Sequence, residues 1–288
     1  MSHSSGPLRE SIASLSEDKT RLLQLLRREK AQPPRGIEPR ARAEGTGRTR
    51  VAASRGQQRL WFIHQLEGGS PAYYIAISLR LRGPLSPDVL QAALDSLLER
   101  HEVLRTRFVT VGGTPYQEIV PPTRFALSVV QAGSVQSQRV SDSHLENEIR
   151  QHELEEAHAR FDLSTGPLIR GRLLQLDAND HVLLLTAHHI IADGWSVAVL
   201  LRDLSALYEA RSSQTAVALE PLPLQYADYS QWQHEWLQSA AYDKQLRYWT
   251  SHLKGAPALL ELPTDQLRPA LQSYRGGNLR FSLNAKLC

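Results

Sequence analysis

The sequence has little cysteine and no long apolar run: one cysteine occurs in 288 residues, and it is the last residue, Cys288. An internal disulfide or a metal site built from several cysteines is therefore excluded. A reducing, cytoplasmic setting is the simplest expectation. No segment approaches the roughly 20 consecutive apolar residues of a membrane-spanning helix, and the N-terminus lacks the apolar core of a signal peptide. We expect no membrane span and no membrane partner.

A strong excess of one charge is also lacking, because the formal net charge is only +3. Nothing in this balance demands a nucleic acid. The positive charge is local, since arginines gather among proline, glycine, alanine and threonine just before residue 51, without any periodicity. We interpret this segment as a flexible basic linker and expect no nucleic-acid partner. Its arginines are Arg35, Arg40, Arg42, Arg48 and Arg50.

A short helix is predicted ahead of this linker, over residues 16–31. Ser16 is a suitable N-cap, acidic residues follow it in the first turn, and basic residues occupy the last turn, which matches the helix dipole. Pro33 and Pro34 end the helix. Its apolar side indicates packing on its own domain or on a neighbour, and a specific docking role is the alternative.

Beyond residue 50 the sequence alternates between helical and strand patterns. Apolar residues three and four apart predict helices, and alternating ones predict strands. Two helices on one side of a mainly antiparallel sheet form an α+β layer, which is the fold class that we expect. The aromatic residues of the last two helices are expected in the core. The predicted helices cover residues 53–63, 88–101, 145–160, 197–208, 226–236 and 242–253, and the predicted strands cover 74–81, 106–111, 116–120, 168–176, 181–185 and 279–283.

The chemistry concentrates in the stretch from Thr186 to Ser196, which contains two adjacent histidines, an aspartate and a glycine. An apolar strand leads into it and an amphipathic helix follows, so the polar groups stand at the junction of two rigid elements. Neighbouring residues at the end of a strand point to opposite faces. His188 and His189 are therefore expected to have different roles, one packed and one facing a cavity.

Three kinds of chemistry are compatible with a histidine pair. A metal site is disfavoured, because adjacent strand residues do not converge easily on one ion and no His-Glu-x-x-His spacing is present. A nucleophilic triad needs a serine or cysteine at a nucleophile elbow, and none is found. General-base or positioning chemistry by an imidazole remains. The residues alone leave open the alternative that both histidines are satisfied core residues.

A family resemblance favours the chemical interpretation. The run from His188 to Gly194 fits the His-His-x-x-x-Asp-Gly signature of condensation domains of nonribosomal peptide synthetases and of the wider chloramphenicol acetyltransferase-like acyltransferases. Four further blocks resemble that family in the same order: residues 54–63, 100–108, 161–170 and 226–232. The resemblance begins near Val51 and extends to the C-terminus. It implies a chloramphenicol acetyltransferase-like lobe of α+β class.

The resemblance also implies an activity, peptide-bond formation between two thioesters carried on the 4'-phosphopantetheine arms of carrier domains. The expected partners are the donor and acceptor peptidyl or acyl carrier domains and a neighbouring adenylation domain. No intrinsic cofactor and no metal are expected. The alternatives are a truncated, non-catalytic fragment that only binds carrier proteins, and a stand-alone acyltransferase acting on a soluble amine or alcohol.

The same resemblance assigns a role to each residue of the signature. His189 is expected to act as the base or as the positioner of the attacking amine. Gly194 allows a close backbone approach, with its N–H facing the charge that develops on the thioester oxygen. His188 is expected to support the site, and Asp193 to form an ion pair with Arg105 that holds the motif loop in place.

The family's two-lobed layout suggests three parts. Residues 1–50 are interpreted as a leader helix and a flexible basic linker, 51–235 as the N-terminal lobe, and 236–288 as the beginning of an incomplete C-terminal lobe. With half of the cleft absent, the 288-residue chain by itself is expected to be inactive.

Overall fold

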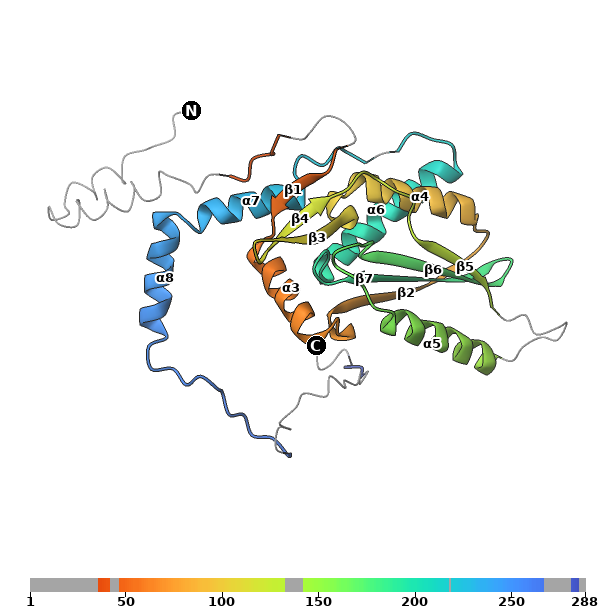
Figure 1. Ribbon diagram of the computed structural model, residues 1–288. Helices are drawn as coiled ribbons and strands as arrows, with labels where there is room; N and C mark the ends of the chain where they lie inside the picture. The colour runs from red at the N-terminus through yellow and green to blue at the C-terminus, as the bar shows by residue number, and fades with distance from the viewer. Residues whose placement is uncertain (1–35, 42–46, 133–141, 218, 267–280, 285–288) are drawn as a thin grey trace, which may run out of the picture.

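A computed structural model describes residues 36–41, 47–132, 142–217, 219–266 and 281–284, arranged as two sheets with helices packed around them (Figure 1). The leader helix expected over residues 16–31 lies outside the described residues. Within the described part of the chain, no helix combines the length and the apolar character needed to cross a membrane.

The larger sheet has four strands in the order β2-β7-β6-β5. The strand β7 (Asp180–His188) lies between β2 (Tyr74–Arg82) and β6 (Ile169–Asp177) and runs antiparallel to both. The edge strand β5 (Leu127–Gln131) runs parallel to β6. The register places Tyr74 opposite His188, so the last residue of β7 meets the first residue of β2.

Helices cover both faces of this sheet, which explains the continuous apolar run of β7. Residues of β7 alternate between two clusters: Leu183, Leu185 and Ala187 enter the main core, and Val182 and Leu184 enter a smaller core on the opposite face. The main core is closed by α4 (Pro87–Arg100) and α6 (Gly194–Ser212), and α5 (Asp142–His158) packs against β2 and β7 from the other side (Figure 1). The expected pair of helices on one face is thus joined by a third helix on the other.

The smaller sheet has three strands in the order β1-β4-β3. The hairpin of β3 (Thr106–Val111) and β4 (Thr114–Ile119) is the one that the sequence predicts, and β1 (Thr49–Ala52) adds to its edge. After β1 the chain enters α3 (Arg55–Glu67), whose capping box pairs Ser54 with Gln57. Two short 3-10 helices, η1 (Pro71–Tyr73) and η2 (Glu102–Arg105), precede β2 and β3.

Of the last two helices in the described part of the chain, α7 (Tyr226–Trp236) packs beside β1, whereas α8 (Ala240–His252) extends away from the sheets (Figure 1). The expected aromatic core is wrong for α8, where Tyr248 and Trp249 are 59% and 54% exposed. Helical spacing alone does not reveal whether a neighbouring element covers an apolar stripe. Residues 281–284 have no regular structure, and the remaining part of the strand expected over 279–283 lies outside the described residues.

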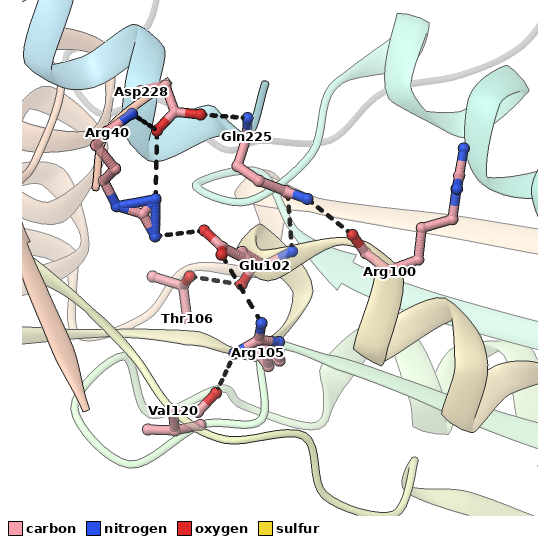
Figure 2. Close-up of polar contacts among 8 residues, drawn as sticks. All are labelled: Arg40, Arg100, Glu102, Arg105, Thr106, Val120, Gln225 and Asp228. Atoms are coloured by element: carbon pink, nitrogen blue, oxygen red, sulfur yellow. Dashed lines mark hydrogen bonds and ion pairs between the residues drawn. The ribbon is translucent and has the colours of Figure 1, made fainter. Parts of the chain in front are cut away.

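The basic segment before residue 51 is bound to the folded part at several positions, so the prediction of a flexible linker is wrong there. The Arg40 guanidinium contacts Glu102 at 2.6 Å and Asp228 at 3.3 Å (Figure 2). Arg50 belongs to β1 and contacts Glu118 at 2.9 Å. The reason is tertiary: buried carboxylates need cations, and composition does not show where those carboxylates lie.

Replacing Arg40 by alanine should destabilise the fold by about 3 kcal/mol, because it removes a buried cation from two carboxylates. The Asp228 side chain is fully buried, and that of Glu102 is 11% exposed. The free energy of unfolding from urea titration measures the effect.

Arg48→Ala is the matched control from the same segment, since the Arg48 side chain is 62% exposed and lies 3.8 Å from Glu118. Exposed ion pairs contribute about 0–1 kcal/mol. Equal losses in the two variants would contradict the anchoring role of Arg40.

Candidate active site at the junction of β7 and α6

The two histidines stand where β7 ends and a short turn leads into α6. The backbone N–H of His188 donates to the carbonyl of Leu168 at 2.9 Å, and the N–H of His189 donates to the carbonyl of Tyr73 at 2.8 Å. The turn closes with the N–H of Ile191 donating to the carbonyl of His188 at 3.0 Å. Both histidines are thus held by backbone hydrogen bonds to separate segments of the fold.

His188 is buried in an aromatic surround, with 1% of its surface exposed. Its ring centroid lies 5.3 Å from that of His64, 5.6 Å from that of Tyr74 and 6.2 Å from that of Phe161. The Nδ1 atom accepts the backbone N–H of Ile190 at 3.0 Å. Burial is the main cause that lowers the pKa of His188 to about 3, so the ring stays neutral at physiological pH.

His189 has the opposite environment, as expected for adjacent residues at a strand end. Its side chain is exposed, and it makes no side-chain hydrogen bond to the residues that the structure describes. Its backbone is nevertheless fixed by Tyr73. The imidazole is therefore exposed while the position of its backbone is constrained.

Asp193 begins α6 as its N-cap. Its Oδ1 accepts the backbone N–H of Ser196 at 2.8 Å and the Ser196 hydroxyl at 2.6 Å. These two hydrogen bonds are the main causes that hold the pKa of the Asp193 carboxyl below its usual range. The carboxylate also interacts electrostatically with His189. Asp193 thus stabilises the start of α6 and adds negative charge near His189.

Gly194 is the first residue of α6, and it is exposed. A Cβ atom built on it would meet no heavy atom within 4 Å, apart from those of its immediate neighbours and of the first turn of its own helix backbone. The glycine is therefore not required by packing in the described structure. It leaves open the space in front of the helix N-terminus, where the first N–H groups lack intrahelical acceptors.

The expected ion pair between Asp193 and Arg105 is not formed among the described residues. Arg105 donates from Nη1 to the carbonyl of Val120 at 2.5 Å, and its Nη2 lies 3.9 Å from Glu102 (Figure 2). Asp193 uses its carboxylate to cap α6 instead. Resemblance of sequence blocks indicates that two residues lie in the same region, but it does not reveal which of several nearby partners each one contacts.

The structure adds residues that the sequence did not single out. Gln57 donates to the carbonyl of Ile190 at 3.4 Å, and the Tyr226 hydroxyl hydrogen-bonds the Ser54 hydroxyl at 2.9 Å while interacting electrostatically with Asp193. His64 lies with its Nδ1 atom 3.3 Å from Nε2 of His188. Ser54, Gln57 and Tyr226 lie in blocks that carry the family resemblance, but the sequence assigned them no role, and no spacing or motif pointed to His64.

The described residues offer no group of three or more histidine, cysteine, aspartate or glutamate side chains that could hold a metal ion. The chemistry available from the protein itself is thus an exposed imidazole, a neutral buried imidazole behind it and a helix N-terminus beside it.

The sequence profile of the condensation domain matches residues 48–288. The chain is 42% identical over 231 residues to malpinin synthetase of Mortierella alpina, covering 80% of this chain and 3% of that protein. It is 38% identical over 280 residues to phosphinothricin tripeptide synthetase PhsC of Streptomyces viridochromogenes, covering 97% of this chain and 25% of that protein.

Among solved structures, the fold is similar to the X-domain from teicoplanin biosynthesis, with a TM-score of 0.69 and 33% identity. The alignment covers 83% of this chain and 50% of that one. The X-domain has also been solved in a complex with OxyB. The chain thus spans about half the length of this structural relative and a small part of the synthetases.

The buried, neutral state of His188 should make the fold sensitive to acid. The unfolded chain takes up a proton near pH 6.5, whereas folded His188 does so only near pH 3. The stability that depends on this residue is therefore complete above about pH 6.5 and is lost as the pH falls toward 3. Between pH 7 and pH 5 the wild type should lose about 2 kcal/mol more than a His188→Asn variant. Urea unfolding at both pH values measures this, and equal losses would show that His188 is not held neutral.

Removing the cap of α6 should cost about 1 kcal/mol of unfolding free energy in Asp193→Ala, because the N–H of Ser196 loses its acceptor. Asp193→Ser keeps a capping hydroxyl and is the matched control, expected to retain most of that stability. Urea unfolding at pH 7 compares the two. An alanine variant as stable as the serine variant would remove the capping assignment.

Proposed function

The chain belongs to the condensation domain family of nonribosomal peptide synthetases, and on that premise we propose that it forms an amide bond between two carrier-bound thioesters. The amine nitrogen of the acceptor attacks the thioester carbonyl of the donor. A carbon–nitrogen bond forms, the carbon–sulfur bond breaks, and the donor thiol leaves with a proton. The substrates are carried on the phosphopantetheine of carrier domains, with no cofactor of the domain's own.

The observation that carries this proposal is the placement of His189 at the junction of β7 and α6. An exposed imidazole on a fixed backbone can accept a proton from the attacking amine or hold that amine by a hydrogen bond. An α-amine has a pKa of about 7.7–8.0, so a useful fraction is already neutral near pH 7. Orienting the amine can therefore contribute as much as removing its proton.

The N-terminus of α6 supplies the second half of the chemistry. Negative charge develops on the thioester oxygen as the amine attacks, and a backbone N–H can stabilise such charge. The N–H of Ser196 already donates to the Asp193 carboxylate, so the group in question is the N–H of Gly194 ahead of it. Gly194 stands at this start with open space before it. A substrate can approach the backbone there more closely than beside any larger residue.

The partners in this reaction are donor and acceptor carrier domains, supplied by a synthetase that also contains an adenylation domain. A binding role without catalysis is the second candidate, because the X-domain, which is similar to this chain, is found in a complex with OxyB. The two candidates differ in one respect. A binding module retains its partner without any dependence on the His189 imidazole, whereas amide formation requires it.

Replacing His189 by alanine should reduce amide formation by at least about 100-fold, because general-base or positioning catalysis contributes about 10²–10⁴. The assay mixes donor- and acceptor-loaded carrier domains with the protein and detects the dipeptidyl carrier by intact-protein mass spectrometry. Because the chain covers 50% of the X-domain's length, the assay is run on the 288-residue chain and on the chain joined to the second half of a relative's condensation domain.

His144→Ala, an exposed substitution on α5, is the matched control and should leave the rate unchanged. Turnover by the His189→Ala variant at the control rate would remove His189 from the chemistry. Carrier binding without turnover in the wild type would favour the binding module.

Replacing Gly194 by alanine separates catalysis from folding. The added Cβ meets no neighbouring side chain, so the unfolding free energy should change by no more than about 0.5 kcal/mol. Amide formation should fall at least about tenfold, because the methyl group occupies the approach to the helix N-terminus. An unchanged rate would show that the substrate does not approach at this position.

A further inference from the structure

His64 has no part in the chemistry described so far, yet it is the polar group in contact with the inner histidine. It lies in the last turn of α3, and its Nδ1 atom is 3.3 Å from Nε2 of His188. The two rings meet edge to face with centroids 5.3 Å apart. His64 is half-buried, so it lies between the buried His188 and the surface.

One backbone N–H group determines which ring nitrogens of this histidine pair carry protons. The N–H of Ile190 can only donate, so Nδ1 of His188 is an acceptor and carries no proton. The single proton of neutral His188 is therefore on Nε2, which donates to Nδ1 of His64. His64 must in turn be neutral, with its own proton on Nε2. Ile190 therefore donates a hydrogen bond to His188, and His188 donates one to His64.

The surroundings of His64 are built to hold this arrangement. The chain turns immediately after α3, and the N–H of Gly69 donates to the carbonyl of His64 at 3.1 Å. Gly69 has a φ of +83°, and a Cβ there would lie 3.2 Å from Cε1 of His64, so a side chain would press on the ring. Glycine at this position therefore permits the left-handed turn and leaves room for the imidazole of His64.

The contact between His64 and His188 is connected to the backbone of His189 through hydrogen bonds. His188 holds the N–H of Ile190 through Nδ1, and residue 189 lies between the two. On the other side, the N–H of His189 donates to the carbonyl of Tyr73, the last residue of η1. Rotation of the His188 ring would release Ile190 and shift the backbone that carries His189.

We propose that His64 is a positioning residue for amide formation: by accepting a hydrogen bond from the Nε2–H group of His188, it fixes the orientation of that ring and, through it, the backbone of His189. This proposal rests on the proposed function. His64 does not touch the substrate, and its effect is on the placement of the reacting imidazole. Misplacement of a catalytic group by about 1 Å is enough to cost a factor of about 100 in rate.

Protonation of His64 would break the lock, because two N–H groups would then face each other. The titratable groups that interact with the His64 ring are Asp162, which follows α5, and His188 at the end of β7. Burial lowers the pKa of His64, and Asp162 opposes that shift only in part. The contact is therefore intact at neutral pH and is lost as the pH falls through the lowered pKa of His64.

Nitrogen NMR of the 288-residue chain labelled with ¹⁵N-histidine tests the contact without any activity. We expect His64 in the single tautomer with Nε2 protonated, and a nitrogen–nitrogen coupling between Nδ1 of His64 and Nε2 of His188. In a His188→Phe variant, His64 should revert to the tautomer mixture of a free imidazole. A protonated Nδ1 on His64, or a mixture already present in the wild type, would overturn the contact.

Two substitutions test the consequence for the reaction, assayed on the active form of the protein. His64→Asn keeps an acceptor oxygen near the Nδ1 position without a titrating group, and should retain at least about a third of the wild-type kcat with a flatter acid limb in the pH profile. His64→Phe keeps the ring but removes the acceptor, and should lower kcat about tenfold or more with KM unchanged. His144→Phe on α5 is the surface control.

The outcomes separate the two proposals. Equal kcat in the wild type and His64→Phe would overturn the positioning role while leaving the proposed function standing. If wild-type protein forms no amide, the proposed function fails, and the nitrogen coupling by itself supports or overturns the contact. If the phenylalanine variant unfolds at the assay temperature, the wild-type NMR spectrum and His64→Asn decide. A coupling that is missing in the wild type, or an acid limb of the pH profile that is unchanged in His64→Asn, would sink the proposal.

Discussion

The central strand β7 is the element on which the rest of this structure depends. It is paired on both edges and buried on both faces, so its residues have no freedom to slip or rotate. A shift of one residue would exchange the two faces and expose the apolar cluster on each. That constraint carries through to the strand's last residue, His188, and fixes where the turn into α6 begins. The histidine pair therefore stands where a strand that is paired on both edges comes to its end.

At the turn between β7 and α6, one side of the chain faces the core and the other faces the surface. Inward, His188 is neutral, buried among aromatic rings and committed at both nitrogens. Outward, His189 and Gly194, the first residue of α6, are exposed. Asp193 joins the two sides, because its side chain caps the helix while its charge reaches His189. Adjacent residues thus have opposite environments, as the geometry of a strand end requires.

Buried charge ties the parts of the chain together away from this site. Glu102 in η2 and Asp228 in α7 come from distant segments, and Arg40 bridges them from the stretch before β1 (Figure 2). Gln225 reinforces the same junction through hydrogen bonds to the backbone of Glu102 and Arg100. Two carboxylates buried near each other would repel without a cation, so the arginine is required wherever the carboxylates come together. Arg105 takes part in this network rather than in the site.

Local pattern was sufficient for much of the architecture: the strand ending at His188, the hairpin of β3 and β4, and the helices α4 and α6 follow from periodicity and turn residues. The opposite environments of His188 and His189 follow from strand geometry. The sequence did not predict the partners of polar side chains, because these depend on which groups the fold brings within 3–4 Å. Arg40, Arg105 and His64 show this, since a side chain selects its partner from everything nearby in space. The sequence alone determined most of the elements, apart from the edge strands β1 and β5, and it placed the histidine pair at the junction of a strand and a helix. Only the tertiary structure decided which charge is neutralised by which, and which imidazole supports which, because those contacts join residues that are distant along the chain.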